Sequence, residues 1–450
     1  MDLTGKMVTV IGVGKTGLAT VRFLAGRGAR ISLTDEKPPD AWGDARTVLG
    51  EVQADLRIAP YGAEALEGAE LVVPSPGVSP ANPILREALR LGIPIVSELE
   101  LAFRFLSTPV VAITGTNGKT TVTTLIGELL AAAGKRVFVG GNIGAPLIGY
   151  ADGPQDADWA VVEVSSFQLQ WASTFRPRVA LLLNTAPDHV DYHGSFAAYR
   201  EAKERIFACQ GTGDTAVLNA DEDATALLAG RIAARTEFFS SLRTVERGMF
   251  IAGENLLRID PAGGREQYPR AMIRLPGRHN IENVMAAIIA ARACGCTPEQ
   301  ITGAVERFRG IGHRIEYVDE RGGVRYYDDS KGTNVAAVVR ALESFSAPVV
   351  LLLGGRDKEG DFETLIPLLR QRVKAMVLFG EARGKIDDCI GGVVATALAA
   401  TLREAVEAAG KIATPGDVVL LSPGCASFDE FSGYKERGER FQEMVRRLKR

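Results

Sequence analysis

Short runs of apolar residues recur along the whole chain, and most of them are followed at once by a glycine or a polar residue. Most runs also lack the alternation of a half-exposed strand, so they predict strands that are buried on both faces of a sheet. The runs are residues 7–13, 30–34, 110–113, 159–162, 179–183, 349–353, 375–379 and 418–421. Stretches with apolar residues at helical spacing lie between them, which predicts an α/β fold with mostly parallel sheets.

The length of the chain and the grouping of these runs predict three domains. A chain of 450 residues is too long for a single hydrophobic core. We place the first domain at residues 1–97, the central domain at 98–309 and the C-terminal domain at 310–450. Short loops with glycine or proline join the three domains, and each domain is expected to be an α/β unit with its own sheet.

The first domain carries a glycine pattern at the turn after its first strand. Gly12, Gly14 and Gly17 have the spacing of a Rossmann turn, and Asp35 follows at the end of the second strand. In dinucleotide-binding enzymes such glycines let the backbone approach a pyrophosphate, and the acid binds a ribose. The pattern therefore predicts a Rossmann-like domain, and it leaves an NAD-dependent oxidoreductase open as an alternative.

The central domain begins with a second phosphate-binding signature. The strand at 110–113 leads into Gly115-Thr-Asn-Gly-Lys-Thr120, and a helical pattern follows. Strand, glycine turn and helix start together form a cradle in which backbone N–H groups hold phosphate. In that cradle Lys119 would reach the terminal phosphates and Thr120 would bind Mg²⁺. We therefore predict a P-loop, although Ile113 stands where a strict Walker motif has glycine.

Polar residues follow two buried strands of the central domain, at the sheet edge where parallel α/β sheets bind ligands. Glu163 follows the run at 159–162, and an acid at that place beside a P-loop can hold Mg²⁺. Asn184 follows the next run, and two acids and two imidazoles lie between Asp188 and His193. We favour a magnesium or phosphate role for this loop over zinc, because a third nitrogen or sulfur ligand is not evident. A polar surface loop is the other alternative.

Lys203 stands out because its charge falls on the apolar side of a predicted helix. Ser195 has the place of an N-cap. Phe196, Tyr199 and Ile206 lie on the same helical stripe as the lysine. Burial disfavours the charged form of an amine and so lowers its pKa. The pattern alone favours a simpler arrangement, in which the stem of the side chain packs inward and the ammonium group stays in water.

Charged and amide side chains also stand at the boundaries of predicted elements in the last part of the chain. Examples are Asn283, Arg314, Asp329 and Lys358. Arginine and lysine can clamp an anion, and an aspartate can accept a hydrogen bond from a ribose or bind a cation. Loops are commonly polar without a functional reason, so a plain polar loop is the alternative at each of these positions.

Composition and charge argue against several classes of protein. The formal net charge is −3, which gives no reason for binding to nucleic acid or to an anionic membrane. The five cysteines include no pair with zinc spacing, and we interpret all five as reduced, in a cytoplasmic protein. The N-terminus lacks the pattern of a signal peptide, and no apolar run is long enough to span a bilayer. We expect a soluble monomer that acts on small molecules.

Taken in order, these motifs resemble one family over nearly the whole chain, from Ile11 to Tyr434. The family is the Mur ligases, ATP-dependent enzymes that form amide bonds in peptidoglycan precursor synthesis. The loop at 114–121 is similar to the shortened Walker loop of this family, which accounts for Ile113. Within the family, the chain resembles the members that add D-glutamate, and the segments that carry this likeness are 329–334, 353–358 and 421–431.

The resemblance implies three groups of ligand-binding residues. The first domain of these ligases grips the uridine diphosphate (UDP) part of the substrate instead of a nicotinamide. The positions that match residues near that ligand are Lys15, Thr16, Asp35, Gly77 and Asn142. The positions that match ATP-binding residues are Gly115, Thr116, Asn117, Gly118, Lys119, Thr120, Thr121, Asn283, Arg314 and Asp329. The positions that match D-glutamate contacts are Thr333, Lys358, Ser427 and Tyr434.

The resemblance also changes the interpretation of Lys203. This residue matches the carbamylated lysine of the family, in which CO₂ adds to an uncharged amine and the resulting anion binds Mg²⁺. One Mg²⁺ would be held by Thr120 and Glu163, and a second by His189 and the carbamate on Lys203. The implied catalytic residues are Lys119, Glu163, His189 and Lys203.

The implied reaction adds D-glutamate to UDP-N-acetylmuramoyl-L-alanine in two steps. ATP phosphorylates the L-alanine carboxylate, and the amine of D-glutamate then attacks the acyl phosphate. Because the matching residues belong to two domains, we expect the C-terminal domain to close on the central one before the chemistry. The alternatives are a Mur ligase that adds another amino acid, an NAD-dependent oxidoreductase, and a nucleotide-dependent switch without ligase chemistry.

Overall fold

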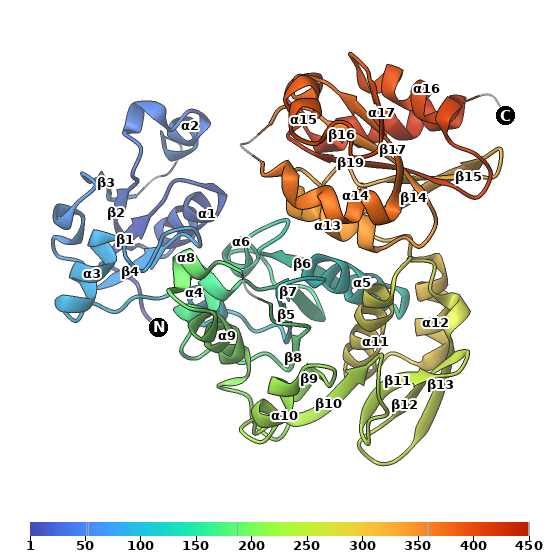
Figure 1. Cartoon of the computed structure of the whole chain (residues 1–450). Coiled ribbons are helices and arrows are strands. Elements are labelled where there is room, and N and C mark those ends of the chain that lie inside the picture. Colours follow the sequence, from blue (N-terminus) through green and yellow to red (C-terminus); the bar gives the residue numbers. More distant parts are fainter. Residues whose placement is uncertain (51, 53, 187, 358–359, 449–450) are drawn as a thin grey trace. The chain divides into compact units, whose positions relative to one another are not determined.

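The structure is a computed structural model, and it describes residues 1–50, 52, 54–186, 188–357 and 360–448. Strands and helices alternate over most of the chain, and the strands form three sheets, as the sequence predicts (Figure 1). The chain folds into two compact units, one made of residues 1–273 and 279–307 and the other of residues 274–278 and 308–450. The first unit contains two of the sheets and the second unit contains one.

The N-terminal part forms a four-stranded parallel sheet in the order β3-β2-β1-β4. Its strands are β1 (Met7–Ile11), β2 (Arg30–Thr34), β3 (Leu56–Ile58) and β4 (Leu71–Pro74), and its helices are α1 (Lys15–Ala25), α2 (Asp44–Gly50) and α3 (Pro83–Arg90). The first strand ends two residues earlier than predicted, because the backbone turns at Gly12 with a φ of +105°. This turn lets α1 approach the strand so closely that a Cβ atom on Gly17 would meet the carbonyl group of Gly12.

The central part forms a nine-stranded sheet in the order β13-β12-β11-β10-β9-β8-β5-β7-β6. Its strands are β5 (Val110–Thr114), β6 (Val137–Gly141), β7 (Trp159–Glu163), β8 (Val179–Leu182), β9 (Thr215–Asn219), β10 (Arg235–Ser240), β11 (Gly248–Ala252), β12 (Asn255–Ile259) and β13 (Arg265–Pro269). The pairs from β6 to β11 are parallel, and β12 and β13 extend the sheet with antiparallel pairs. The strand β5, which leads into the predicted P-loop, therefore lies between β7 and β8, inside the parallel part.

Helices lie between most of these strands, as the alternating pattern predicts, whereas β10 to β13 follow one another in a described stretch that has no α-helix between them. The helices are α4 (Glu98–Phe103), α5 (Lys119–Ala132), α6 (Leu147–Ala151), α7 (Ser166–Gln170), α8 (Val190–His193), α9 (Phe196–Glu204), α10 (Asp223–Ala229), α11 (Arg278–Ala293) and α12 (Pro298–Arg307). The longest helix of the described residues is α11, with 16 residues, whereas a membrane span needs about 20. No helix in the described ranges is both long enough and apolar enough to cross a membrane.

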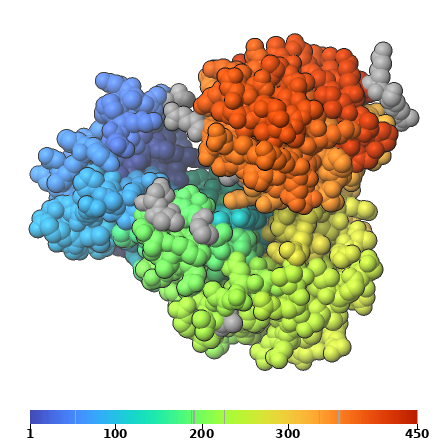
Figure 2. Space-filling view, in the orientation of Figure 1, coloured from blue at the N-terminus to red at the C-terminus, as the bar shows by residue number. Residues whose placement is uncertain are grey.

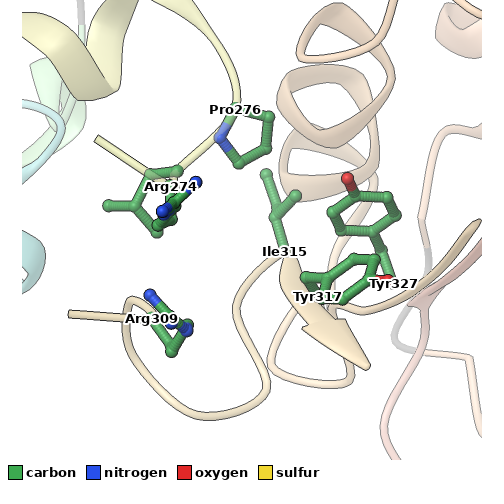
Figure 3. Close-up of a pocket in the computed structure, with 7 residues that line it drawn as sticks. Arg274, Pro276, Arg309, Ile315, Tyr317 and Tyr327 are labelled. Carbon is green, nitrogen blue, oxygen red and sulfur yellow. The ribbon is translucent and has the colours of Figure 1, made fainter. Parts of the chain in front are cut away.

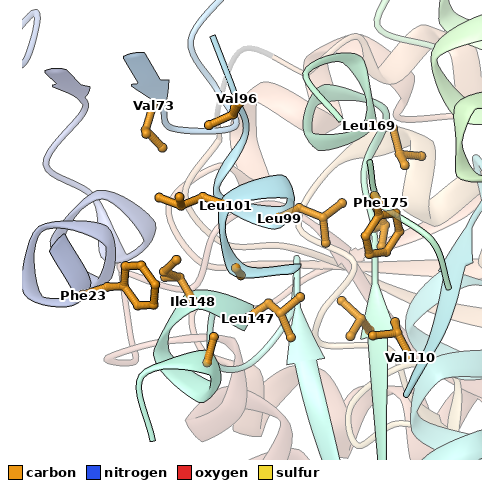
Figure 4. Close-up of a cluster of buried hydrophobic side chains, with 14 of the residues drawn as sticks. Phe23, Val73, Val96, Leu99, Leu101, Val110, Leu147, Ile148, Leu169 and Phe175 are labelled. Atoms are coloured by element: carbon orange, nitrogen blue, oxygen red, sulfur yellow. The ribbon is translucent and has the colours of Figure 1, made fainter. Parts of the chain in front are cut away.

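The two sheets of the first unit share one buried cluster of apolar side chains (Figure 4). Phe23 of α1 and Val73 of β4 belong to this cluster, and so does Val110 of β5. Leu101 of α4 and Ile148 of α6 are fully buried and belong to it as well. Burying a side chain of this kind stabilises the fold by about 1.5–3 kcal/mol. The two short helices thus help to join the N-terminal and central sheets into one unit.

A buried carboxylate anchors α4 to the loop before β8. One oxygen atom of Glu100 accepts hydrogen bonds from the backbone N–H groups of Ser173, Thr174 and Phe175, at 3.0–3.1 Å. The other oxygen accepts bonds from the Thr174 hydroxyl at 2.6 Å and from Arg104 at 2.9 Å. Burial raises the pKa of this carboxyl, but the hydrogen bonds outweigh burial and lower the pKa overall.

We therefore expect the substitution Glu100→Gln to lower the free energy of unfolding at pH 7 by about 2 kcal/mol, because an amide N–H group would face backbone donors. Since the folded-state pKa lies below the ordinary value of 4.5, the ionised carboxylate stabilises the fold above pH 4.5, and this contribution is lost as the pH falls further. Urea unfolding midpoints at pH 7 and pH 4 measure both effects. Glu201→Gln, at an exposed position of α9, is the control. If the unfolding midpoint of Glu100→Gln differed from that of wild type by the same amount at pH 7 and at pH 4, the stabilising role of the ionised carboxylate would be contradicted.

The second unit contains a six-stranded sheet in the order β14-β15-β19-β16-β17-β18. Its strands are β14 (Glu316–Arg321), β15 (Val324–Asp328), β16 (Val349–Gly354), β17 (Val373–Phe379), β18 (Ala395–Leu398) and β19 (Val418–Gly424), and its helices are α13 (Val335–Glu343), α14 (Ile366–Arg372), α15 (Arg383–Ile390), α16 (Leu402–Ile412) and α17 (Tyr434–Arg447). Alternate residues of β16 belong to two different buried clusters, one shared with α13–α15 and the other with α16 and α17. Helices thus cover both faces, and the unit forms a rounded body of its own, orange to red in Figure 2.

All five cysteines are free thiols, and they differ in accessibility. Cys294, Cys296 and Cys425 are buried, Cys209 is half-buried, and Cys389 of α15 is exposed. Burial raises the pKa of the Cys425 thiol to about 12, so at neutral pH this thiol stays protonated and unreactive.

Candidate functional site

The turn between β5 and α5 has the structure of a phosphate-binding loop. Gly118 caps the helix with a φ of +81°, and a Cβ atom there would meet the side chain of Asn283. Asn184, just beyond β8, holds the loop from the neighbouring strand. Its carbonyl oxygen accepts the N–H of Thr116 at 2.9 Å, and its side chain both accepts from the N–H of Asn117 at 2.8 Å and donates to the Asn117 carbonyl at 3.1 Å. The predicted ATP residue Asn283 therefore lies against the predicted P-loop.

Lys119 stands at the first position of α5 and bends back over the loop. Its ammonium group donates to the carbonyl oxygens of Gly115 at 2.8 Å and of Thr116 at 2.9 Å. Thr120 and Thr121 follow in the same first turn of the helix. A phosphate above the loop would meet backbone N–H groups, the positive end of the helix dipole and this ammonium group together.

Glu163, the last residue of β7, is 2% exposed and only partly satisfied. Its Oε1 atom accepts a hydrogen bond from the Asn142 side chain at 2.8 Å. Its Oε2 atom is buried and has no hydrogen-bond partner among the described residues. A buried carboxylate oxygen of this kind needs a cation or a donor. Because oxygen atoms of carboxylates and hydroxyls are the ligands that Mg²⁺ prefers, Glu163 and the hydroxyl of Thr120 fit this ion.

Lys203 points into the unit and not into water, which corrects the arrangement that its helical pattern alone favours. The side chain is 2% exposed, and its ammonium group donates to the carbonyl oxygen of Gly115 at 2.8 Å. The same group lies 4.5 Å from the centre of the Tyr199 ring. Burial, and after it the charge of Lys119, lower the pKa of Lys203 to about 7, although the nearby acids Asp188 and Glu163 act in the opposite direction. A large part of the amine is therefore uncharged at neutral pH, as carbamylation requires.

Aromatic side chains connect His189 with this lysine. The His189 ring lies 4.8 Å from the ring of Phe167 and 6.1 Å from that of Tyr199, centre to centre. The hydroxyl of Tyr199 is 3.1 Å from the hydroxyl of Thr116 in the P-loop. The structure thus gathers four of the residues implied by the resemblance, Lys119, Glu163, His189 and Lys203, around one loop.

The residues expected to bind the UDP part of a substrate come from four segments of the first unit. Lys15 and Thr16 begin α1, directly after the Rossmann turn. The Lys15 ammonium group donates to the carbonyl of Gly144, which lies in the same loop as Asn142. Gly77 is exposed in the loop after β4. The contact between Lys15 and Gly144 brings the Asn142 loop to the start of α1.

Asp35 stabilises the loops around it. One carboxylate oxygen accepts the N–H of Val13 at 2.9 Å, and the other accepts the N–H of Lys37 at 2.9 Å. Each oxygen keeps a second lone pair, so both can still accept a hydroxyl group of a ligand. The geometry agrees with the Rossmann-like turn that the glycine spacing predicts, and by itself it does not separate a ribose of NAD from one of UDP.

In the second unit, Asp329 is buried directly after β15. Its carboxylate accepts a hydrogen bond from the Ser422 hydroxyl at 2.7 Å, and its N–H donates to the carbonyl of Leu421 at 2.7 Å. Burial raises the pKa of Asp329 to about 7, and the nearby charge of Arg314 partly opposes this effect. Arg314 is exposed, so its guanidinium is accessible to an anion. These two predicted ATP residues therefore lie close to each other.

A compact hydrogen-bonded group supports the loop that carries Arg314. The His313 ring is 2.7 Å from the Asp328 carboxylate, and this hydrogen bond raises the pKa of His313. The N–H of His313 donates to Glu316 at 2.7 Å. The side-chain amide of Gln442 donates to both acids at 3.0 Å. Because these groups satisfy one another, the cluster is best explained as a support for the neighbouring arginine.

The structure describes three of the four predicted D-glutamate residues, and they come from three different segments of the second unit. Thr333 precedes α13, Ser427 is buried after β19, and Tyr434 begins α17. The hydroxyl of Ser330 donates to the backbone carbonyl of Tyr434 at 2.8 Å and so joins two of these segments. Lys358, the fourth predicted residue, lies outside the described residues.

Three family models match the chain and together cover most of it. The Mur ligase MurD-like N-terminal domain matches residues 6–97, the Mur ligase middle domain residues 113–291, and the Mur ligase glutamate ligase domain residues 313–425. A UDP-N-acetylmuramoylalanine–D-glutamate ligase of Syntrophus aciditrophicus is 58% identical over 447 residues, which is 99% of each chain. This chain belongs to the Mur ligase family. An enzyme of the same name from Geobacter metallireducens is 45% identical, over 100% of this chain and 99% of its own.

Solved structures of Mur ligases share the fold of this enzyme. A UDP-N-acetylmuramate–alanine ligase MurC from Thermotoga maritima matches with a TM-score of 0.56 and 18% identity, over 98% of this chain and 99% of its own. A MurF ligase from the same organism, solved with ADP, matches with a TM-score of 0.57 and 17% identity, over 98% and 95%. The predicted three-domain α/β fold and the predicted ligase class are confirmed, and with them the use of ATP and Mg²⁺ and action on small molecules.

Two side chains that hold this site together are not among the predicted site residues. The sequence places Tyr199 only on a helical stripe, although its hydroxyl touches the P-loop. Arg437 of α17 was not predicted at all, although it is fully buried. The signal for Arg437 was available in the sequence, because it shares a stripe with Phe441 and Val445 at spacings of four residues. Like Lys203, Arg437 is a charged residue on an apolar helical stripe.

The second unit of this Mur ligase also contains a cavity of about 300 Å³ beside the β14–β15 hairpin (Figure 3). Its lining residues are Arg274, Leu275, Pro276, Arg309, Ile315, Tyr317 and Tyr327. The rings of Tyr317 and Tyr327 meet edge to face with their centres 5.6 Å apart. Two guanidinium groups and two phenol rings suit a flat ligand with negative charge. None of the lining residues belongs to the groups that the sequence predicted.

Proposed function

We propose that this enzyme joins D-glutamate to UDP-N-acetylmuramoyl-L-alanine and converts ATP to ADP and phosphate. The observation that carries this proposal is the arrangement around the P-loop. There Lys119 and the buried Lys203 share the carbonyl of Gly115, and one buried oxygen of Glu163 has no hydrogen-bond partner in the described part of the chain. The relatives named for this reaction at 45% and 58% identity support the choice of substrates. The product would serve peptidoglycan precursor synthesis in the cytoplasm.

In the first proposed step, an oxygen of the L-alanine carboxylate attacks the terminal phosphorus of ATP, and ADP leaves. Lys119 stabilises the negative charge on the phosphoryl group during this transfer, and the loop N–H groups position it. Thr120 and Glu163 would hold one Mg²⁺, and His189 and the carbamate of Lys203 a second. When bound, these ions neutralise phosphate charge and raise the electrophilicity of phosphorus. Asn283, Arg314 and Asp329 are the remaining proposed contacts of ATP.

In the second proposed step, the amine of D-glutamate attacks the carbonyl carbon of the acyl phosphate. The tetrahedral intermediate expels phosphate, and the nitrogen loses a proton to leave an amide. Thr333, Ser427 and Tyr434 would position the amino acid, and Lys358 would bind one of its carboxylates. Lys15, Thr16, Asp35, Gly77 and Asn142 would hold the UDP part of the other substrate.

The proposal is tested by phosphate release from ATP in the presence of Mg²⁺, UDP-N-acetylmuramoyl-L-alanine and one amino acid at a time. We expect release to require D-glutamate and the product to be heavier by one glutamyl residue in mass spectrometry. Release with another amino acid would keep the ligase mechanism and correct the substrate. Release without any amino acid would favour a nucleotide-dependent switch, and absence of release with all amino acids would contradict the proposal.

NAD⁺ is expected not to bind the N-terminal Rossmann-like part. The glycine pattern and Asp35 would allow a dinucleotide, but the proposed ligand of this part is the UDP moiety. Isothermal titration with NAD⁺ should show no saturable heat, whereas UDP-N-acetylmuramoyl-L-alanine should titrate to saturation. Saturable binding of NAD⁺ would revive the oxidoreductase alternative.

Three further points stay predictions. The domain bounds of 1–97, 98–309 and 310–450 are supported by the family models, whose limits fall within them. The monomeric state can be measured by analytical ultracentrifugation. Closure of the C-terminal domain during the reaction can be measured by small-angle X-ray scattering with and without substrates.

A further inference from the structure

We infer that Arg437 is a positioning residue that fixes the amino-acid subsite of the enzyme by holding three backbone segments together. This inference rests on the proposed function, because it takes Thr333, Ser427 and Tyr434 to be contacts of D-glutamate. Arg437 itself is 0% exposed, so it acts on the substrate through its neighbours.

Hydrogen bonds from Arg437 reach two loops of the second unit. Its Nε donates to the Ser330 hydroxyl at 3.0 Å, and one Nη donates to the Ser330 carbonyl at 2.9 Å and to the Cys425 carbonyl at 3.1 Å. The other Nη donates to the Ala426 carbonyl at 3.2 Å. One planar guanidinium thus bridges the loop after β15 and the loop after β19, while its own helix, α17, supplies the third segment.

These contacts lie next to the predicted D-glutamate residues. The loop after β15 continues from Ser330 to Thr333, and Ser427 directly follows the two carbonyl groups that Arg437 binds after β19. Tyr434 precedes Arg437 by one helical turn, and its carbonyl accepts the Ser330 hydroxyl at 2.8 Å. A shift of Arg437 would therefore move all three at once.

The chemistry of the bridge explains why an arginine stands here. All acceptors that the described residues give to Arg437 are neutral oxygens, three carbonyls and one hydroxyl. Burial lowers the pKa of Arg437 to about 10, so the group keeps its charge at neutral pH. Only a guanidinium offers five donors in one plane, and an ammonium group on a shorter stem cannot reach both loops in the same geometry.

The predicted ATP contact in the same loop is held by other groups. Asp329 donates its N–H to the Leu421 carbonyl and accepts the Ser422 hydroxyl, and neither bond involves Arg437. A change at Arg437 should therefore affect the amino-acid substrate more than ATP. This difference separates a positioning role from a merely structural one. If the role were only structural, replacing Arg437 would lower all activities together.

The test compares Arg437→Met and Arg437→Lys with Arg440→Met, which removes an exposed arginine one turn further along α17. Two reactions are measured on each enzyme, both with ATP and UDP-N-acetylmuramoyl-L-alanine. One is phosphate release with D-glutamate, and the other is hydroxamate formation with hydroxylamine, which intercepts the acyl phosphate without using the amino-acid subsite. Thermal unfolding of each variant shows whether it is folded at the assay temperature.

For Arg437→Met we expect the KM for D-glutamate to rise about tenfold or more, since several charge-assisted hydrogen bonds are lost. The KM for ATP and the hydroxamate rate should stay within about threefold of wild type. The KM for D-glutamate of Arg437→Lys should lie between those of wild type and Arg437→Met. Arg440→Met should match wild type in all three quantities. If Arg437→Met is unfolded, Ser330→Ala, which removes the hydroxyl between Arg437 and Tyr434, should raise the same KM by a smaller factor.

Equal losses in both reactions, or unchanged KM for D-glutamate in folded variants, would overturn the inference. Failure of the proposed function would look different, because wild-type enzyme would then release no phosphate with D-glutamate.

Discussion

Replacing Lys203 with alanine is expected to abolish phosphate release, and acetate is expected to restore part of it. The lysine is buried against the P-loop, its pKa is lowered to about 7, and it shares an acceptor with Lys119. An ammonium group at this place would repel the cations that ATP needs, whereas its carbamate would bind them. Acetate can occupy the space left by the side chain and supply a carboxylate.

The rescue has two controls that separate charge from volume. Acetamide has the size of acetate without its charge, so it should not restore activity. Lys411→Ala, which removes an exposed lysine of α16, should leave the rate unchanged. Wild-type enzyme in ¹³C-labelled bicarbonate should show a carbamate signal that is absent from Lys203→Ala. Wild-type rates from the variant, or equal rescue by acetamide, would remove the carbamate from the mechanism.

Lys119→Ala is expected to lower turnover by about 10³-fold or more, because the phosphoryl group loses its cation at the moment of transfer. Binding of UDP-N-acetylmuramoyl-L-alanine should be unchanged, since the proposed contacts of the UDP part are elsewhere. Phosphate release measures the first effect and isothermal titration the second. Loss of both would indicate misfolding and not a catalytic role.

The same variant offers a second measurement. The charge of Lys119 helps to lower the pKa of Lys203. Removing that charge should raise the pKa of Lys203 and reduce the uncharged fraction of its amine at pH 7. Carbamate formation in Lys119→Ala, followed by ¹³C signal against pH at constant CO₂, should therefore shift to higher pH. An unchanged profile would show that burial alone sets the pKa.

The fold could be predicted well where a strand is buried on both faces. The runs that became β5, β7, β16 and β19 are apolar throughout, and each is only four or five residues long and is followed by a polar residue or a glycine, which favours a buried strand over a helix. The antiparallel strands β12 and β13 were not predicted, because their sequence carries charges. The structure buries one of them, Arg258, and satisfies it with Glu237 at 2.8 Å and Glu266 at 3.3 Å. A pattern of polarity cannot show that two distant acids will pair with an arginine.

The candidate site was predicted unevenly for a related reason. The P-loop is recognisable because all its parts are contiguous in sequence. Lys203 could be found as a charge on an apolar stripe, but its contact with Gly115 depends on how two helices pack, so the pattern alone favoured an exposed ammonium group. The support that Asn184 gives to the loop and the bridge made by Arg437 consist mostly of bonds to backbone carbonyl and N–H groups. Such bonds cannot be predicted from the types of the residues that supply the backbone groups, because nearly every residue has a backbone carbonyl and N–H group.

The five thiols differ in accessibility, and this makes the second unit, which contains Cys389, easy to observe in solution. Cys389 is the exposed one, on the surface helix α15, and Cys425 stays protonated at neutral pH. With the half-buried Cys209 changed to serine, a maleimide dye should attach to Cys389 almost alone. Fluorescence anisotropy or energy transfer from that dye could then follow the motion of the second unit during turnover, and no cysteine would have to be introduced.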